Sequence, residues 1–489
     1  MLGSGAIPSA SQDQAGPRPA LLIATMSVVA LTVAVLQTGV VPILAVMARQ
    51  LDASLLDVSW TVTANLLAAA ATTPLIGRLA DLHVKKRVLL IVLGVVLAGS
   101  LLAALTTSLP MLIVARVLQG ASFSLYPIGV SILREELAPG RLMGAMAVLS
   151  GVLGFGGGMG LVITGLLMRG DAGYQRMFWF TAAFSVLVIV AVAAVVPQRP
   201  RSTTGSVDWA GAAGLAIGLS LLLLAITQGN TWGWASARTP AVGLAGVSAL
   251  GVWWWWWERR CRQPLVSTVM LTRRPILMTN IATVAVGMGL YFGFLGLTTF
   301  VQAPTARGYG FGATVLQASV VFLLPGAMAG FLTALASGRY IDRFGGRRVL
   351  MVGAAIGVAG FAMLTVGHSA PWQVIAAGIL INAYISLAYG ALPALVVREV
   401  EPGETGVATS VNAIARTVGA AMAAALVAVL LSRNGTDFPP ESSYTVIFGL
   451  GAVMALIALL LIAASRPRLR PIASVDEISD VRAMNHEWG

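Results

Sequence analysis

Two arginines stand inside long apolar stretches of this chain, where a guanidinium needs a partner. Arg116 follows Ala115, and Arg416 follows Ala415 in a second apolar stretch. An uncompensated charge at membrane depth costs about 2.5 kcal/mol or more, so each arginine must face water or a polar group. Gln119 lies one helical turn from Arg116, and Glu135 and Glu136 lie further along the same stretch. These three are the candidate companions of Arg116.

Proton transfer needs a group that titrates, and arginine stays charged. The apolar stretch 31–44 contains no ionisable residue. The carboxylates left as candidate proton carriers are Asp57, Asp81, Glu135, Glu136 and Asp208, all near the ends of apolar stretches. None of them lies at mid-membrane depth, so the residues alone argue weakly against proton transport.

Metal, redox and enzyme chemistry have little support. The chain has a single cysteine, Cys261, which excludes an internal disulfide and a cysteine metal site. The three histidines, His83, His368 and His486, are far apart in sequence. A membrane-embedded enzyme would need a cluster of His, Asp, Glu or Cys, so we expect no enzyme activity, metal site or cofactor.

A short polar segment occurs twice, at 77–90 and 338–351, each time between apolar stretches. A carboxylate at a helix end can meet the N-terminus of a neighbouring helix or an adjacent basic residue, and so hold one face of a bundle shut. A loop that only sets topology would need the basic residues but not the glycine or aspartate. The proposed gating residues are Gly77, Asp81, Arg87, Gly338, Asp342 and Arg348.

The elements that carry these residues are membrane helices. The chain is 57% hydrophobic and 10% charged, its mean hydropathy is +0.86, and a spanning helix needs about 20 apolar residues. We predict an all-α polytopic protein with fourteen spans. They cover 20–48, 56–78, 88–107, 110–134, 140–168, 177–197, 208–229, 239–258, 276–304, 313–339, 349–368, 372–398, 405–432 and 443–464.

The duplicated segment predicts two related six-helix bundles. We assign 20–197 to the first bundle, 198–275 to two additional helices with linkers, and 276–464 to the second bundle. Residues 1–19 and 465–489 are expected to be disordered cytoplasmic tails. Most of the 31 Lys and Arg residues then fall on the side of the tails, which places both termini in the cytoplasm and explains the net charge of +12 without nucleic acid.

Small residues and tryptophans mark helix contacts. A glycine run permits close helix packing, and it comprises Gly151, Gly154, Gly156, Gly157, Gly158 and Gly160. Five consecutive tryptophans, 253–257, precede Glu258 and are expected to anchor a helix end at the membrane interface, in preference to stacking on a substrate.

Polar and aromatic residues inside spans usually face protein or water. Those expected to line a cavity between the bundles are Gln37, Asn65, Gln119, Tyr126, Asn280, Tyr291, Phe294, Asn382, Tyr384, Asn412 and Arg416. A cavity with few charges would suit amphipathic, cationic or lipid-like compounds better than sugars or phosphates.

The paired loops, the Arg-x-x-Gln-Gly pattern at Arg116 and the glycine run resemble the major facilitator superfamily, over about 20–465. Fourteen spans resemble its drug:H+ antiporter branch. The resemblance implies a multidrug exporter that exchanges substrate for protons, with Arg116 linked to proton coupling, and membrane lipids and small amphipathic molecules as partners. The chain departs from the family at Val84, where glycine is usual, and at Gly157, where proline is usual.

The Arg-rich, Lys-poor composition indicates a bacterial protein of the inner membrane. We expect it to be a monomer.

Two other functions stay open. An uncoupled or narrow-substrate exporter of a lipid or metabolite would not need a proton carrier. A transport-dead receptor or scaffold would keep the fold and lose the coupling acids.

Overall fold

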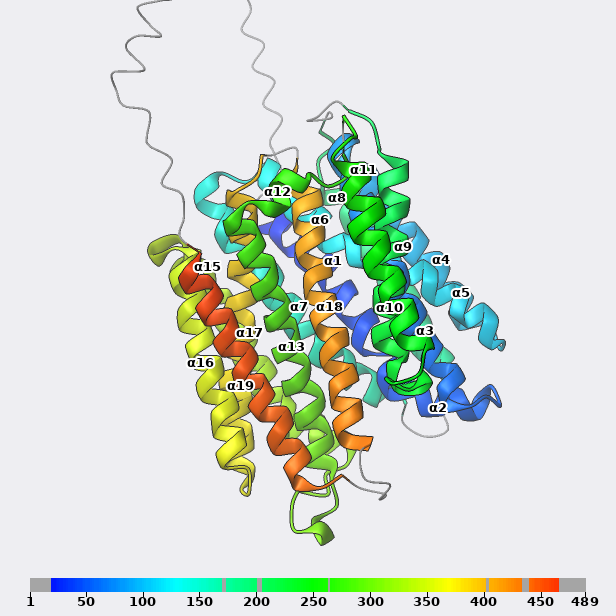
Figure 1. Ribbon diagram of the computed structural model, residues 1–489, viewed down its shortest axis with the longest axis vertical. Coiled ribbons are helices and arrows are strands. Elements are labelled where there is room, and N and C mark those ends of the chain that lie inside the picture. Colours follow the sequence, from blue (N-terminus) through cyan, green and yellow to red (C-terminus); the bar gives the residue numbers. More distant parts are fainter. Residues whose placement is uncertain are drawn as a thin grey trace, which may run out of the picture.

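The computed structural model describes residues 19–168, 173–199, 205–262, 264–401, 404–432 and 439–465, and it is helical (Figure 1). The predicted tails fall almost wholly outside these residues. Twelve helices in the described part of the chain are long and apolar enough to cross a membrane. The chain is thus a multi-pass membrane protein.

The twelve helices follow one another along the chain. They are α1 (Pro19–Thr38), α4 (Lys85–Leu105), the continuous stretch of α5 (Leu109–Gly120), η2 (Ala121–Ser124) and α6 (Leu125–Glu136), α7 (Pro139–Leu167), α8 (Gln175–Val195), α9 (Trp209–Trp232), α13 (Arg274–Gln302), η5 (Ala318–Leu323) with α15 (Leu324–Phe344), α16 (Gly346–Val366), α17 (Pro371–Arg398), α18 (Thr405–Ser432) and α19 (Glu441–Ala464).

The prediction of fourteen spans is not supported, because two of the predicted segments fall outside this set. The segment 56–78 forms α3 (Leu55–Leu82), a long helix whose polar residues lower its hydropathy. The segment 239–258 is divided by a π-helical stretch, η3 (Ala249–Trp254), into α10 (Arg238–Ser248) and α11 (Trp255–Glu258). Neither α10 nor α11 reaches the length of a span by itself, and the segment they form together with η3 is not among the twelve apolar helices.

The first predicted helix also ends earlier than expected. The range 20–48 is divided into α1 and α2 (Leu44–Gln50) by a 3₁₀ turn at Val41–Ile43. Pro42 lies in this turn, and proline cannot donate the backbone hydrogen bond that a continuous helix requires. Three short helices complete the described part of the chain: α12 (Thr268–Thr272) before α13, the 3₁₀ helix η4 (Thr305–Arg307) after α13, and α14 (Val315–Gln317) before η5.

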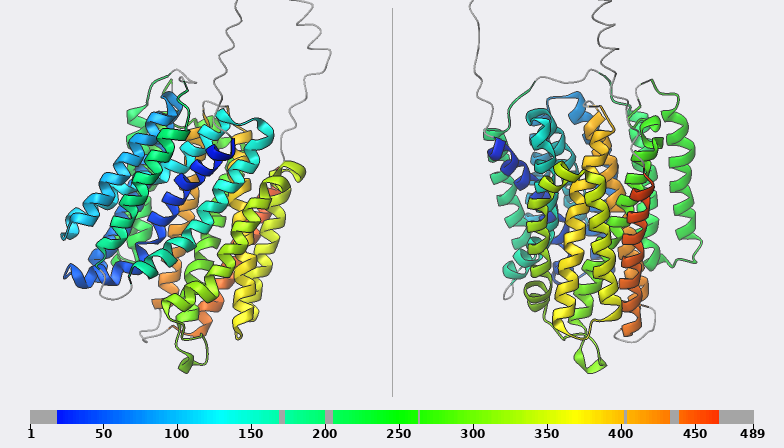
Figure 2. Two further views of the ribbon diagram at one scale, coloured as in Figure 1. Left: turned by 180° about the vertical axis from the view of Figure 1, so that it is seen from behind. Right: turned by 90° about the vertical axis from the view of Figure 1, so that its left-hand side faces the viewer.

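The helices form two groups that contact each other along a few elements. In the first group α1 packs against α7 and α8, and α4 against α5 and α8; in the second α16 packs against α17 and α19, and α13 against α18 and α19. Contacts between the groups come from α7 with α15 and α17, and from α18 with α3 and α6. The α9–α10 pair stands at one side of the bundle (Figure 2), where α9 packs against both α3 and α18.

Glycines of α7 make the contact between the groups close. A Cβ atom at Gly151 would overlap Ala334 of α15, and one at Gly156 would come within 2.7 Å of Ala34 of α1. Gly160 faces Thr38 of α1 and Gly158 faces Ala327 of α15. The glycine run therefore lets α7 lie between α1 of its own group and α15 of the other, since a Cβ atom at Gly151, Gly156 or Gly160 would overlap the neighbouring helix.

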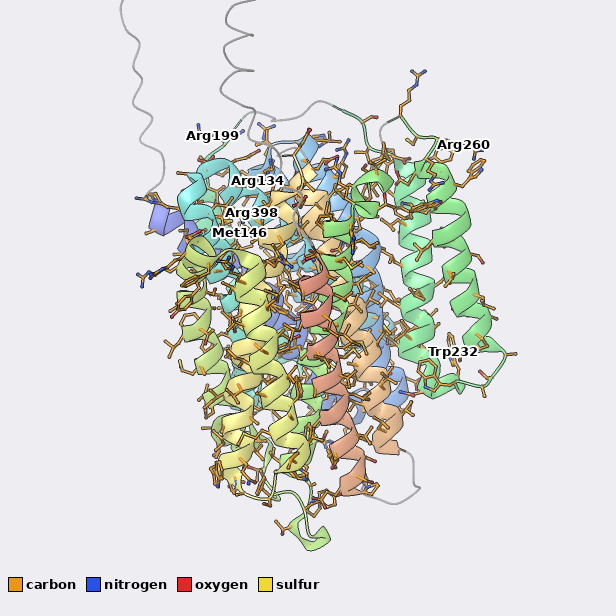
Figure 3. The ribbon with its side chains drawn as sticks, turned by 60° about the vertical axis from the view of Figure 1, so that its left-hand side comes forward. Arg134, Met146, Arg199, Trp232, Arg260 and Arg398 are labelled. Atoms are coloured by element: carbon orange, nitrogen blue, oxygen red, sulfur yellow. The ribbon has the colours of Figure 1, made fainter. Side chains whose placement is uncertain are left out.

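Charged side chains gather at one end of the bundle, which we call the basic end. Arg134, Arg199, Arg260 and Arg398 lie toward this end in Figure 3, whereas Trp232 lies at the opposite, far end. The duplicated loops that begin α4 and α16 are at the basic end as well.

Candidate functional site: a cavity between the two helix groups

A cavity lies between the two groups and is lined by α1, α7, α13, η5, α15, α17 and α18. Its volume is about 120 Å³, below the range of about 300 Å³ and upward typical of pockets for drug-sized ligands. A larger cavity, about 550 Å³, lies at the basic end beside Arg347 and Arg398, but it opens within the second group only. The cavity between the groups is the candidate transport site, and this conformation is contracted around it.

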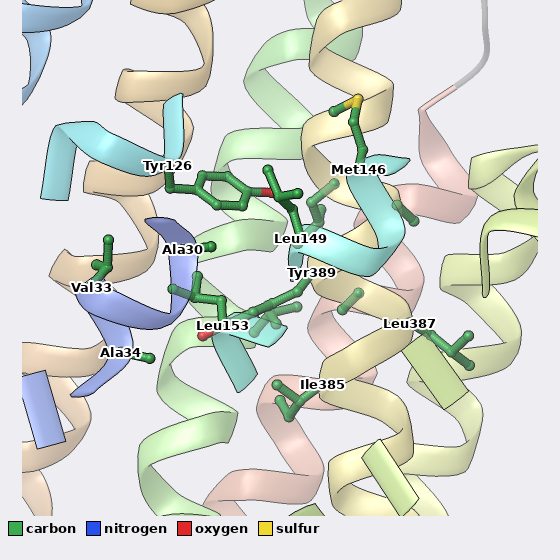
Figure 4. Packing of buried hydrophobic residues seen from close by; sticks show 14 of the residues in the cluster. Ala30, Val33, Ala34, Tyr126, Met146, Leu149, Leu153, Ile385, Leu387 and Tyr389 are labelled. Atoms are coloured by element: carbon green, nitrogen blue, oxygen red, sulfur yellow. The ribbon is translucent and has the colours of Figure 1, made fainter. Parts of the chain in front are cut away.

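Five residues predicted to line a cavity do line this one: Gln37, Tyr291, Phe294, Asn382 and Arg416. Gly154, Gly157 and Gly158 of α7 form part of its wall, so the glycine run contributes space as well as close packing. The rest of the lining is mostly aliphatic, with side chains such as those of the buried cluster in Figure 4, where Leu153 of α7 faces Ile385 and Tyr389 of α17.

Arg416 is the charged residue among the lining side chains. Its guanidinium carbon lies 4.8 Å from the ring centre of Tyr389 and 5.6 Å from that of Tyr126. The Tyr126 hydroxyl is itself held by Ser150, 2.8 Å away. Ring faces attract a cation without neutralising it, so these two tyrosines orient the guanidinium and leave its charge in place.

The other predicted cavity residues lie in the helix packing. Asn412 donates to Asn280 Oδ1 and Thr283 Oγ1, which joins α18 to α13. Asn65 donates to the Arg116 carbonyl at 2.9 Å. Tyr384 is buried and its hydroxyl has no hydrogen-bond partner within the described residues.

Arg116 is almost completely buried, with 1% of its surface exposed, in a network inside the first group. Its Nε donates to the Thr61 carbonyl of α3 at 3.2 Å and its Nη1 to Gln119 Oε1 at 2.6 Å. Gln119 in turn donates to Ser100 Oγ of α4 at 2.9 Å. The predicted contact with Gln119 is confirmed, and the network ties α3, α4 and α5 together.

The other two candidate companions of Arg116, Glu135 and Glu136, pair with other residues. Glu135 pairs with Lys85, and Glu136 accepts hydrogen bonds from Arg199 at 2.8 and 3.1 Å. Both carboxylates lie at the basic end, in the last turn of α6, whereas Arg116 lies in α5. The hydrogen bonds from Arg199 to Glu136 raise the pKa of the arginine, and they tie the linker after α8 to α6.

Asp81 joins the two groups at the basic end. Its carboxylate is fully buried and accepts hydrogen bonds from the backbone amides of Gly406 and Val407, at 3.1 and 3.2 Å. These amides are in the first turn of α18, where the helix leaves N–H groups unpaired and favours negative charge. The expected contact between this aspartate and a helix N-terminus is therefore present. Gly77, one turn earlier, lies against Gly406.

Arg134 adds a second connection at the same end. It donates to the Val400 carbonyl at 3.0 Å and to the Thr405 hydroxyl, so α6 is fastened to the loop before α18. Arg134 is not among the residues selected from the sequence, although it opens the charged run before Glu135 and Glu136 at the end of an apolar stretch. Together Asp81 and Arg134 close the basic end of the interface between the groups.

The second copy of the loop makes a different contact. Gly338 of α15 lies against Gly144 of α7, where a Cβ atom would overlap the Gly144 Cα. Asp342, Arg87 and Arg348 are exposed. The glycine of each copy thus packs onto the opposite group, but the buried aspartate belongs to the first copy.

The departure at Val84 has a local explanation. Val84 precedes α4 with φ −62° and ψ 108°, a conformation that any residue adopts. Gly345 holds the matching position before α16 with φ 82°, which favours glycine. The first loop therefore does not need glycine at this position.

A buried acidic pair, which the sequence alone does not assemble, lies at the basic end of α9 and α11. Asp208 caps α9 by accepting from the Gly211 amide at 2.9 Å, and it also accepts from Trp257 Nε1. Glu258 accepts from Trp254 Nε1 at 2.9 Å, while its Oε2 has no partner within the described residues. A Cβ atom at Gly211 would approach both carboxylates, so the two acids lie close together.

The remaining candidates have structural roles. Asp57 is exposed at the far end, where its amide donates to Ser54 Oγ at 3.1 Å in the cap of α3. Among the described residues no group of three or more His, Cys, Asp or Glu side chains could hold a metal ion.

Two groups of spanning helices that meet around a contracted cavity, and that are closed at one end by polar contacts, define a membrane transporter. The family comparison agrees, since residues 26–424 and 277–482 match the family described as Major Facilitator Superfamily. The chain belongs to this superfamily.

Relatives include transporters of different named substrates. The chain is 27% identical over 407 residues to the uridine/deoxyuridine transporter of Lactococcus lactis subsp. cremoris, covering 80% of this chain and 81% of the relative. It is 28% identical over 403 residues to the tetracenomycin C resistance and export protein of Streptomyces glaucescens, covering 80% and 72%. The crystal structure of the human organic anion transporter MFSD10 has the same fold, with a TM-score of 0.64 and 15% identity over 91% of this chain and all of that one.

Proposed function

We propose that this protein exports small amphipathic or lipophilic compounds by alternating access, using the cavity between the two helix groups. The observation that carries the proposal is the closed basic end: Asp81 and Arg134 fasten the first group to α18 and its preceding loop. Such contacts can break and reform while the rest of each group stays packed, which is the motion that alternating access requires. Several relatives, among them the tetracenomycin C exporter, are named as exporters.

The proposal includes a topology. The protein acts as a monomer in the inner (cytoplasmic) membrane. Both termini and the basic end lie in the cytoplasm, an orientation that the distribution of Lys and Arg favours. We further propose that α3 and the α10–α11 segment also cross the membrane, because α3 has 28 residues and would be about 42 Å long. The two bundles would then be 20–197 and 276–464, with the additional pair of helices between them.

Exchange for protons is the second part of the proposal, and it needs a carboxylate. No carboxylate lines the cavity in the described residues. The Asp208–Glu258 pair supports it, because the two buried carboxylates lie close together and Glu258 Oε2 has no hydrogen-bond partner within the described residues. A like charge nearby favours the protonated form of a buried carboxyl group. The uncoupled exporter is the alternative, and the absence of an acid from the cavity lining favours it.

Proteoliposomes containing the purified protein test both parts. Wild type is expected to move an amphipathic dye across the membrane, and with the potential clamped at zero an imposed pH gradient is expected to drive it. Glu258→Gln should abolish the response to the pH gradient, while Asp57→Asn, at the exposed cap of α3, should leave it unchanged. Dye transport by wild type that does not change with the pH gradient would reject proton exchange. The absence of dye transport under any gradient would reject export.

A further inference from the structure

We propose that the cavity selects organic anions, and that Arg416 is the residue that binds their acidic group. This inference rests on the proposed function, because it names the substrate class of the same cavity. It reverses the sign expected from the sequence, where a cavity with few charges suggested cationic compounds.

The position of Arg416 is fixed by its helix. Arg416 lies on α18 where α18 packs tightly on α13, and its backbone carbonyl is so close to Gly287 that a Cβ there would overlap it. The side chain is half-buried and reaches the cavity lining. The backbone that carries Arg416 is therefore held firmly against α13, and its side chain forms part of the cavity lining.

The charge of Arg416 has no counter-ion in the described structure. The ion pairs found there join Lys85 to Glu135, Arg199 to Glu136 and His368 to Glu441. The buried carboxylates of Asp81, Asp208 and Glu258 accept hydrogen bonds from other groups. The rings of Tyr389 and Tyr126 lie beside the Arg416 guanidinium.

An unpaired guanidinium in a mostly apolar cavity attracts anions and repels cations. Its planar fork fits a carboxylate, sulfonate or phosphate with two parallel hydrogen bonds, and the low dielectric of the cavity strengthens the attraction. Gln37 and Asn382 provide amides in the same lining, while Phe294 and Leu297 offer an apolar surface for the rest of the molecule. The fitting ligand is therefore an amphipathic organic anion.

Such a substrate also suits a cavity without an acid. In a cell whose interior is negative, the membrane potential drives an organic anion outward. Export of this substrate class therefore requires no proton carrier in the cavity.

Binding to the purified protein in nanodiscs of neutral phosphatidylcholine tests the inference separately from transport. The probes are fluorescein, an anion at pH 8, and rhodamine 123, a cation built on the same xanthene core. Wild type is expected to bind fluorescein at least tenfold more tightly than rhodamine 123, measured by fluorescence polarisation. Arg416→Gln should remove this preference, and Arg416→Lys should retain most of it.

Two further variants separate charge recognition from folding. Tyr389→Leu removes the ring under the guanidinium and should weaken fluorescein binding several-fold, whereas Arg343→Gln removes an exposed arginine of α15 and should change nothing. Each variant is first shown to elute as a monodisperse protein with a wild-type melting temperature. Equal binding of the two dyes, a preference that survives Arg416→Gln, or no fluorescein binding up to millimolar concentration would overturn the inference. Binding without transport would reject the proposed export and leave the anion preference standing.

Discussion

The carboxylate of Asp81 accepts a hydrogen bond from the backbone amide of Gly406, 325 positions further along the chain, at 3.1 Å. This contact joins α3 to the first turn of α18 and is buried from solvent. A charged acceptor at a helix N-terminus is stabilised both by the amides and by the helix dipole. The closed basic end therefore depends in part on the side chain of Asp81.

Asp81→Asn is expected to open the basic end. Each hydrogen bond to a charged group contributes about 1.5–3 kcal/mol, so loss of the charge should shift the balance between closed and open states by tenfold or more. Ser410→Cys in a Cys261→Ser background places a thiol beside Gly77 in this interface. Maleimide labelling of that thiol should accelerate at least tenfold in Asp81→Asn. Asp342→Asn serves as the control, because Asp342 is exposed; equal acceleration by both variants would argue against a specific role for Asp81.

Gly338→Ala is expected to destabilise the protein by about 1–3 kcal/mol, the usual cost of overpacking. Its new methyl group would overlap Gly144 Cα across the interface of α7 and α15. Gly94→Ala is the matched change, since a Cβ atom at Gly94 would meet no neighbouring atom within 4 Å, and alanine improves helix propensity by about 1 kcal/mol. Thermal unfolding in detergent compares the two, and an unchanged Gly338→Ala melting temperature would mean that the groups separate at this point without cost.

Arg116→Ala is expected to act through stability. The change removes a hydrogen bond to the Thr61 carbonyl and leaves Gln119 Oε1 unpaired in a buried site, and the unpaired oxygen costs about 1–3 kcal/mol. We therefore expect a lower melting temperature and an equal loss of transport whichever gradient is imposed. A variant that keeps its stability and loses only the response to a pH gradient would instead support the proton-coupling role that family resemblance implies.

The membrane potential should drive transport of an anionic dye. Moving one elementary charge through 100 mV is worth about 2.3 kcal/mol, which corresponds to a concentration ratio of about 50 at equilibrium for each charge that the dye carries. Proteoliposomes with an imposed potassium diffusion potential are expected to accumulate fluorescein on the positive side, and reversal of the potential should reverse the direction. Accumulation that is insensitive to the potential would mean that a second charge moves with the dye.

The sequence predicted the helical class and most helix positions because apolar length is a local property. The range 405–432 coincides with α18, whereas the predicted range 20–48 runs through the proline that divides α1 from α2. Counting spans was harder, since the polar residues of α3 and the glycines and tryptophans of the segment 239–258 lower the hydropathy of these two segments.

The site was only partly predictable, because a polar residue inside an apolar helix can face either a cavity or another helix. Gln37 and Asn382 line the cavity, whereas Asn65 and Asn412 bind neighbouring helices. Tyr389 was missed because an aromatic residue in an apolar segment is usually packing. Its position under Arg416 depends on how α17 meets α18, which no local pattern encodes.

Dye transport by Gly158→Trp most directly tests the claim that substrate passes through the cavity between the groups. Gly158 lines this cavity, while Gly94 of α4 is exposed and provides the matched change Gly94→Trp. With both variants at wild-type levels in proteoliposomes, we predict that Gly158→Trp abolishes fluorescein transport and that Gly94→Trp retains it. Wild-type transport by Gly158→Trp would contradict passage through this cavity.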